Sequence, residues 1–155
     1  APAAGDPLVE HVRLVDPRYR HRLHDRIPVV AIGKLATPGD VTSAICAGAD
    51  FVTNARGFMF SLGCIQALKC NRNTCPTGVT THDPRLQAGL VAEEKDRRVA
   101  AYARTIIGEV EMIAHSVGVA EPRLMRRRHV RLVQEDGRSV PMNEISPSVQ
   151  RPEPA

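Results

Sequence analysis

Three cysteines that lie close together are the residues of this sequence best suited to chemistry. Cys64, Cys70 and Cys75 stand in the segment CIQALKCNRNTCPTG, a C-x5-C-x4-C arrangement with a proline directly after the last cysteine. Asn71, Asn73 and the Pro and Gly of the last turn favour a chain that folds back on itself, so the three thiols can converge. Thiolates are preferred ligands of zinc and of iron–sulfur clusters. The segment therefore predicts a metal centre.

The spacing favours an iron–sulfur cluster over zinc. Structural zinc sites usually have four ligands with C-x2-4-C pairs, and neither spacing here fits that pattern. A Cys-Pro pair at the final ligand also occurs in iron–sulfur proteins. His82 or Cys46 would supply a fourth zinc ligand, although nothing in the spacing singles them out. A zinc-stabilised structural module and three unconnected thiols stay open as alternatives.

The elements that must position the cysteines alternate between strand and helix. The sequence predicts a strand at 27–32, a helix over 37–47, a strand at 50–54 and a helix over 57–64. The first strand, IPVVAI, is a continuous apolar run, which is typical of a strand covered on both faces. Thr37-Pro38 has the residue types of a helix start, and Gly48 ends the helix. This alternation indicates an α/β fold with a parallel sheet.

In such a fold the loops after the two strands lie at the same end of the sheet. These loops are Gly33-Lys34-Leu35 and Ala55-Arg56-Gly57. Ligands bind at that end both in open parallel sheets and in α/β barrels. Two strands do not close a barrel, which needs eight strand–helix units and about 250 residues. The sequence thus indicates either a small sheet or a part of something larger.

The chain divides into four segments. Residues 1–26 are irregular with a short helix near 18–25, 27–91 hold the two strand–helix units and the cysteine loop, 92–118 form an amphipathic helix, and 119–155 form a basic segment with a loose tail. The amphipathic helix has an apolar stripe at three- and four-residue spacing, made of Val99, Tyr102, Ile106, Val110, Ile113 and Val117. A short strand is expected near 130–132, before a turn at Asp136-Gly137.

The cysteine segment also carries a resemblance to a known family. The stretch GADFVTNARGFMFSLGCIQALKCNRNTCPTGVTTHDPRL resembles the end of the FMN-binding barrel of the glutamate synthase family and its shorter single-barrel relatives. The similarity extends upstream through IPVVAIGKLATPGDVTSAICAGAD and downstream to GVAEPRLMRRRHVRLV, so it covers about residues 22–142. In that family the C-x5-C-x4-C motif holds a 3Fe-4S cluster. The resemblance implies Cys64, Cys70 and Cys75 as its ligands, and not Cys46.

The resemblance also implies a fold and a second cofactor site. The chain would be the C-terminal part of an FMN-binding TIM (β/α)8 barrel, about strands seven and eight plus the C-terminal helix, with strands one to six preceding residue 1. The loops after strands seven and eight hold phosphate in such barrels. The implied FMN-phosphate residues are Gly33, Lys34, Ala55, Arg56 and Gly57. The larger glutamate synthases have glycine where Lys34 and Ala55 stand.

The family's activity is the FMN- and iron–sulfur-dependent reductive amination of 2-oxoglutarate to glutamate, with ammonia released from glutamine. The implied electron donor is ferredoxin or an NADPH-linked subunit, and the glutaminase is expected on another domain or subunit. By this resemblance the chain is a fragment, a truncated reading frame or half of a split enzyme. It would carry the electron-entry end of the oxidoreductase, with no catalytic residue of its own.

Composition narrows the alternatives. Hydrophobic residues make up 43% of the chain and charged residues 25%, which fits a globular protein. No apolar run is long enough to cross a membrane and no signal peptide is recognisable, so a cytoplasmic location is expected. The net charge is +4, and five arginines lie between Arg123 and Arg131 around His129. Without interleaved aromatic residues, this run indicates a solvated face or a domain contact rather than a nucleic-acid site.

Overall fold

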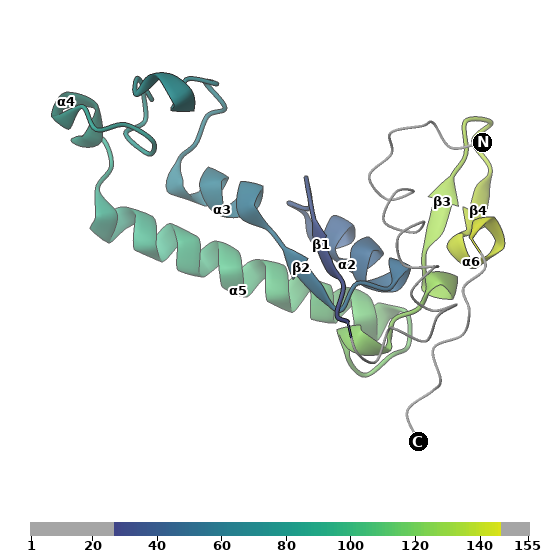
Figure 1. Ribbon diagram of the computed structural model, residues 1–155. Coiled ribbons are helices and arrows are strands. Elements are labelled where there is room, and N and C mark those ends of the chain that lie inside the picture. Colours follow the sequence, from purple (N-terminus) through teal and green to yellow (C-terminus); the bar gives the residue numbers. More distant parts are fainter. Residues whose placement is uncertain (1–26, 147–155) are drawn as a thin grey trace.

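The computed structural model describes residues 27–146, so the helix expected near 18–25 and the end of the tail lie outside the described residues. Figure 1 shows the arrangement of the elements. In chain order they are β1 (Val30–Ile32), α2 (Pro38–Ala47), β2 (Phe51–Thr53), α3 (Ala55–Leu62), η1 (Cys70–Arg72), α4 (Pro84–Gln87), α5 (Ala92–Ser116), η2 (Pro122–Leu124), η3 (Arg127–His129), β3 (Arg131–Val133), β4 (Ser139–Pro141) and α6 (Met142–Ile145).

The two predicted strands pair in parallel, as expected. Val30 lies opposite Phe51, and α2 forms the crossover between β1 and β2. Thr37 caps α2 in a reciprocal arrangement with Asp40, because the Asp40 amide donates to Thr37 Oγ1 at 3.2 Å and the Thr37 amide donates to the Asp40 carboxylate at 3.0 Å. Parallel pairing places the loops after both strands at one end of the sheet.

The start of α3 differs from the prediction. The sequence places Asn54 at the end of the second strand and starts the helix at Gly57, whereas α3 begins at Ala55 with Asn54 as its N-cap. The Asn54 side chain accepts a hydrogen bond from the Gly57 amide at 3.0 Å. This bond satisfies one of the amides that a helix start leaves without a partner, and it allows the helix to follow β2 without an intervening loop.

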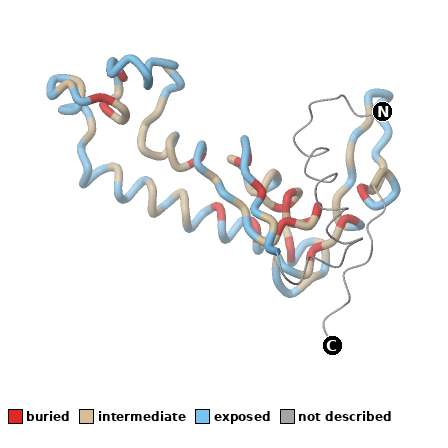
Figure 2. Tube along the Cα trace, viewed as in Figure 1, coloured by how far each residue is buried: buried red, intermediate tan, exposed pale blue. Residues whose placement is uncertain are grey.

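Helix α5 is the long element against which the others pack. It contacts α3 and α2, and its course along both helices is clear in Figure 1. The predicted apolar stripe is confirmed, since Ile106 and Val110 are buried and the other stripe positions up to Ile113 are half-buried. Buried positions gather where β1, α2 and the C-terminal half of α5 meet (Figure 2). These positions form three small clusters that share α2, one with β1, one with α5 and Met125, and one with Met142.

The prediction that the first strand is covered on both faces is wrong for the described residues. Ala31 is fully buried against the α2 side, but Val30 is 52% exposed and Ile32 is 64% exposed. Phe51, opposite Val30 on β2, is 56% exposed. Alternate residues of a strand point to opposite faces, so one face of the sheet packs on α2 and the other is uncovered.

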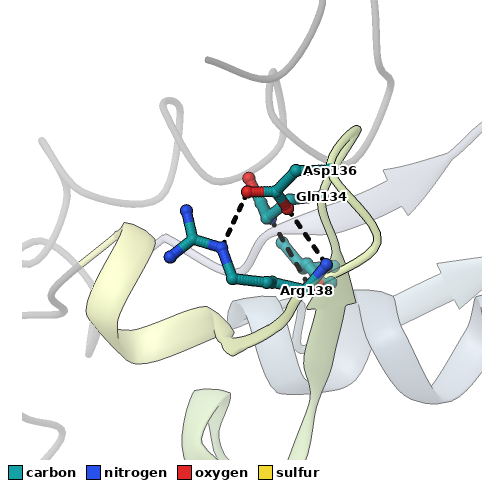
Figure 3. Close-up of polar contacts among 4 residues, drawn as sticks. Gln134, Asp136 and Arg138 are labelled. Carbon is teal, nitrogen blue, oxygen red and sulfur yellow. Dashed lines mark hydrogen bonds and ion pairs between the residues drawn. The ribbon is translucent and has the colours of Figure 1, made fainter.

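The C-terminal part folds into the expected strand and turn. β3 pairs antiparallel with β4, and Gly137 at the turn has a φ of +79°. Arg138 closes the turn by donating from its backbone and its Nε to the Asp136 carboxylate, at 3.0 and 2.7 Å (Figure 3). These bonds hold the pKa of Asp136 below its ordinary value. None of the described helices has the length and apolarity required to cross a bilayer.

The basic run does not form a single solvated face. Arg127 is only 4% exposed, which corrects the prediction for this residue. Its guanidinium donates to the carbonyl of Ala47 at 3.2 Å and to the carbonyl and hydroxyl of Ser146 at 2.9 and 3.1 Å. Arg127 therefore joins the end of α2 to the C-terminal segment, which is a structural role.

Candidate functional site

One cavity brings the two loops and the three cysteines together. It has a volume of about 690 Å³ and lies at the end of the sheet where β1 and β2 lead into their loops. Of the eight residues predicted to bind cofactors, seven line it: Gly33, Lys34, Ala55, Arg56, Cys64, Cys70 and Cys75. The parallel pairing of the strands thus places residues from three separate segments around one space.

The loop after β1 forms one wall of the cavity through Gly33 and Lys34. Gly33 has a φ of +153°, a backbone conformation that residues with a side chain rarely adopt. A Cβ added at Gly33 would have no atom within 4 Å. The backbone conformation, and not crowding, therefore requires glycine there. A ligand that enters the cavity can approach the main chain closely at this point.

The start of α3 forms the neighbouring wall through Ala55 and Arg56. The amides at the first positions of a helix lack partners within the helix, and they attract anions. The predicted residue Gly57 lies behind this wall rather than on it. It is buried, and its amide is already bonded to the Asn54 side chain. The amides of Ala55 and Arg56 come before Gly57 in the chain and do not take part in this capping bond.

The charge of the lining favours an anion. Lys34, Arg56 and Lys69 line the cavity, and no aspartate or glutamate from residues 27–146 does. Lys34 and Lys69 are exposed at its edge, so their ammonium groups can reach a bound ligand without the cost of burying a charge. Lys69 lies in the cysteine loop, and the sequence alone did not predict it as a cofactor-binding residue.

The cysteine loop is the third segment that lines the cavity. All four cysteines of the chain are free thiols, and the three in the loop differ in exposure. Cys70 is exposed, Cys64 is half-buried and Cys75 is buried. Within residues 27–146, no three His, Cys, Asp or Glu side chains come together closely enough to hold one metal ion. The three thiols instead border a space that accommodates a larger group.

The backbone of this loop adopts conformations that are rare for residues with side chains. Gln66, Leu68 and Asn73 have φ values between 54° and 58°, and they are the non-glycine residues with positive φ in the described part of the chain. Asn73 pins the returning segment, since its carbonyl accepts from Thr81 Oγ1 and its side chain accepts from the His82 amide, each at 2.6 Å. Such strain concentrates at ligand-binding sites.

Hydrogen bonds favour the thiolate form of Cys75. Its sulfur lies 3.4 Å from the Thr77 hydroxyl, and hydrogen bonding from Thr77 and then from the Thr80 backbone lowers the pKa of this thiol to about 6. The thiolate, which is the metal-binding form, therefore predominates at neutral pH. Thr80 lines the cavity as well, and hydrogen bonding from its side chain contributes to the lowered pKa of Cys75.

These features fit the two cofactors that the sequence analysis expects. The volume lies within the range of about 300–1,000 Å³ that is usual for small-molecule and cofactor sites. The helix start at Ala55 and Arg56, the turn at Gly33 and the basic side chains suit a phosphate, and three thiols that line one cavity suit a group larger than a single metal ion, such as an iron–sulfur cluster. Met59 and Phe60 line the cavity as well and add apolar surface to it.

Two other candidate ligands lie elsewhere. Cys46 is buried in α2, where it packs against Val110, Ala114 and Met125. His82 is exposed in the loop and does not line the cavity. The structure therefore brings neither residue to the three cysteines.

Comparison with known proteins gives the family. The sequence matches the model of a conserved region in glutamate synthase over residues 3–120. This chain belongs to the glutamate synthase family. It is 38% identical over 146 residues to the glutamate synthase large subunit-like protein YerD of Bacillus subtilis, with 94% of this chain and 28% of that protein covered.

Two further relatives are named as glutamate synthases. The chain is 30% identical to the archaeal glutamate synthase (NADPH) of Methanocaldococcus jannaschii, over 90% of this chain and 27% of that protein. It is 32% identical to the archaeal-type glutamate synthase (NADPH) of Thermotoga maritima, over 74% of this chain and 23% of that protein. The chain thus spans about a quarter of the length of these relatives.

The environment of Cys46 predicts a pH dependence of stability. Burial raises the pKa of this thiol to about 12, an effect that the nearby Arg126 partly offsets. Its pKa in the unfolded chain is about 8.5, so above that pH the unfolded state releases a proton that the folded state retains. The contribution of Cys46 to the free energy of unfolding is therefore complete below about pH 8.5 and declines as the pH rises toward 12.

Urea unfolding of the wild type and of Cys46→Ala at pH 8, 9 and 10 measures this contribution. The stability difference between the two proteins should shrink as the pH rises. Iodoacetamide at pH 8 should leave Cys46 unmodified until urea is added, as detected by mass spectrometry. Rapid alkylation of Cys46 in the folded protein would contradict the prediction.

Proposed function

We propose that this chain supplies the FMN-phosphate loops and the iron–sulfur ligands of a glutamate synthase-type oxidoreductase. The observation that supports this most strongly is that both loops and all three cysteines line the same cavity. In this proposal the chain is the C-terminal part of a TIM barrel, with β1 and β2 as its seventh and eighth strands. The uncovered sheet face fits a barrel whose other strands would enclose it.

Each wall of the cavity has a distinct task in this proposal. The amides of Ala55 and Arg56 and the main chain at Gly33 bind the flavin phosphate, and the Lys34 and Arg56 side chains neutralise its charge. The apolar side chains of Met59 and Phe60 exclude water from the space beside it. No described residue is assigned a catalytic role.

The cysteine loop provides the electron-entry side. Cys64, Cys70 and Cys75 ligate a 3Fe-4S cluster, and hydrogen bonds from Thr77 hold the Cys75 sulfur as thiolate. When bound, the cluster supplies one-electron transfer and FMN supplies hydride transfer. Placing both groups in one cavity keeps them adjacent. Ferredoxin or an NADPH-linked subunit is the proposed electron donor, and the names of the Methanocaldococcus jannaschii and Thermotoga maritima relatives include NADPH.

The proposed reaction is the reductive amination of 2-oxoglutarate to glutamate in the cytoplasm. The ammonia comes from glutamine through a glutaminase domain or subunit outside this chain. No specific observation favours the two alternatives, a zinc-stabilised structural module and a nucleic-acid-binding segment. The three thiols border a space larger than a single zinc ion requires, which argues against a zinc site. Arg127 of the basic run is buried, so fewer arginines are available to bind nucleic acid.

Iron analysis of anaerobically purified protein tests the cluster. The wild type should absorb broadly near 400 nm and contain about three irons per chain. Cys70→Ser should lose most of that iron, because this exposed side chain binds the cluster without contributing to the core. Cys46→Ala is the matched control and should retain it. A colourless wild type with one zinc per chain, or equal iron loss in both variants, would contradict the proposal.

FMN binding tests the phosphate loops. Arg56→Ala should raise the dissociation constant for FMN about tenfold, because a charge-assisted hydrogen bond to the phosphate is lost. The affinity for riboflavin, which lacks the phosphate, should stay unchanged. Arg104→Ala removes an exposed arginine of α5 that does not line the cavity, and it serves as the control. Flavin fluorescence measures both ligands. Equal weakening of FMN and riboflavin would place the phosphate elsewhere.

A further inference from the structure

A chain of hydrogen bonds joins the two loops through Tyr102 of α5. Asn54 Nδ2 donates to the Tyr102 hydroxyl at 2.5 Å, and this hydroxyl donates to the carbonyl of Ala36 at 2.8 Å. At one end, Asn54 Oδ1 accepts from the Gly57 amide at 3.0 Å. At the other end, the Ala36 amide donates to the carbonyl of Lys34 at 2.9 Å. This series of hydrogen bonds therefore connects the start of α3 with the loop after β1.

The position of the Tyr102 ring is tightly defined. The ring is half-buried and meets Phe58 edge-on, with 5.2 Å between ring centroids and 88° between ring planes. A Cβ at Gly57 would overlap the Tyr102 hydroxyl, so the absence of a side chain at Gly57 is what allows this close approach. This packing also explains why Gly57 lies behind the cavity wall.

We infer that Tyr102 is a positioning residue that fixes the two loops relative to each other. The identity of the ligand rests on the proposed function, whereas the connection between the loops does not. A phosphate held by both loops needs them at a fixed separation, and strand pairing sets only where each loop begins. The Tyr102 hydroxyl adds a second connection beyond the strands, through one donor and one acceptor bond.

The substitution Tyr102→Phe isolates this role, because it keeps the ring contact with Phe58 and removes only the hydroxyl. In the native protein the dissociation constant for FMN should rise about tenfold, as expected for the loss of a well-placed pair of hydrogen bonds. The dissociation constant for riboflavin should change little, since riboflavin does not use the phosphate loops. Ser116→Ala is the matched control, because its hydroxyl donates only to the backbone of the same helix, at 2.7 Å.

Hydrogen exchange without flavin tests the connection independently of the ligand. In Tyr102→Phe the amides of residues 34–36 and 55–57 should exchange faster than in the wild type, and in Ser116→Ala they should not. Faster exchange in Tyr102→Phe, together with a wild-type protein that does not bind FMN, would refute the proposed function and support the positioning role.

Two results would overturn the inference. The first is unchanged exchange in both loops of Tyr102→Phe. The second is an equal loss of affinity for FMN and riboflavin together with a lower melting temperature, since that pattern describes a general loss of structure and not a change in loop position.

Discussion

The parallel pairing of β1 with β2 is the constraint on which the site depends. With Val30 opposite Phe51 and Ile32 opposite Thr53, both strands end at the same level of the sheet. The loop after β1 and the start of α3 therefore lie side by side at this end of the sheet. Helix α5, which packs on both α2 and α3, holds these units together. The cavity is a consequence of this arrangement.

The cysteine loop has a different physical basis. Between residues 63 and 91 only Cys75, Gly78 and Thr81 are buried, so the loop has little core of its own. It also contains Gln66 and Leu68 in the left-handed region, where each costs about 1–2 kcal/mol, and Asn73, whose residue type tolerates that conformation. A loop with strain and little burial requires stabilisation from another source. Ligation of its three thiols, which couples binding to folding, would provide it.

Much of the framework could be predicted from sequence, because it depends on local signals. Thr37 and Gly48 marked the ends of α2, and the apolar stripe of α5 marked its buried side. The cysteine spacing and the two loops indicated the cavity lining, apart from Gly57. What the sequence did not reveal depends on contacts between distant segments. In the sequence, Tyr102 is one more position of the apolar stripe of α5. Only the fold shows that its hydroxyl bonds with Asn54 and Ala36.

The other differences have the same origin. Arg127 belonged to a run of charges, and its burial depends on carbonyls contributed by Ala47 and Ser146. The apolar pattern of β1 indicated two covered faces, whereas α2 covers one in the described part of the chain. Asn54 offered a local signal, since asparagine is a favoured N-cap, and that signal would have placed the start of α3 correctly.

The most direct test of the account is crystallography of anaerobically purified protein with anomalous diffraction at the iron edge. The account predicts iron density in the cavity, bonded to the sulfurs of Cys64, Cys70 and Cys75, and flavin-phosphate density between the loops at Gly33 and Ala55. Iron bound away from these cysteines, or an anomalous signal at the zinc edge alone, would contradict it.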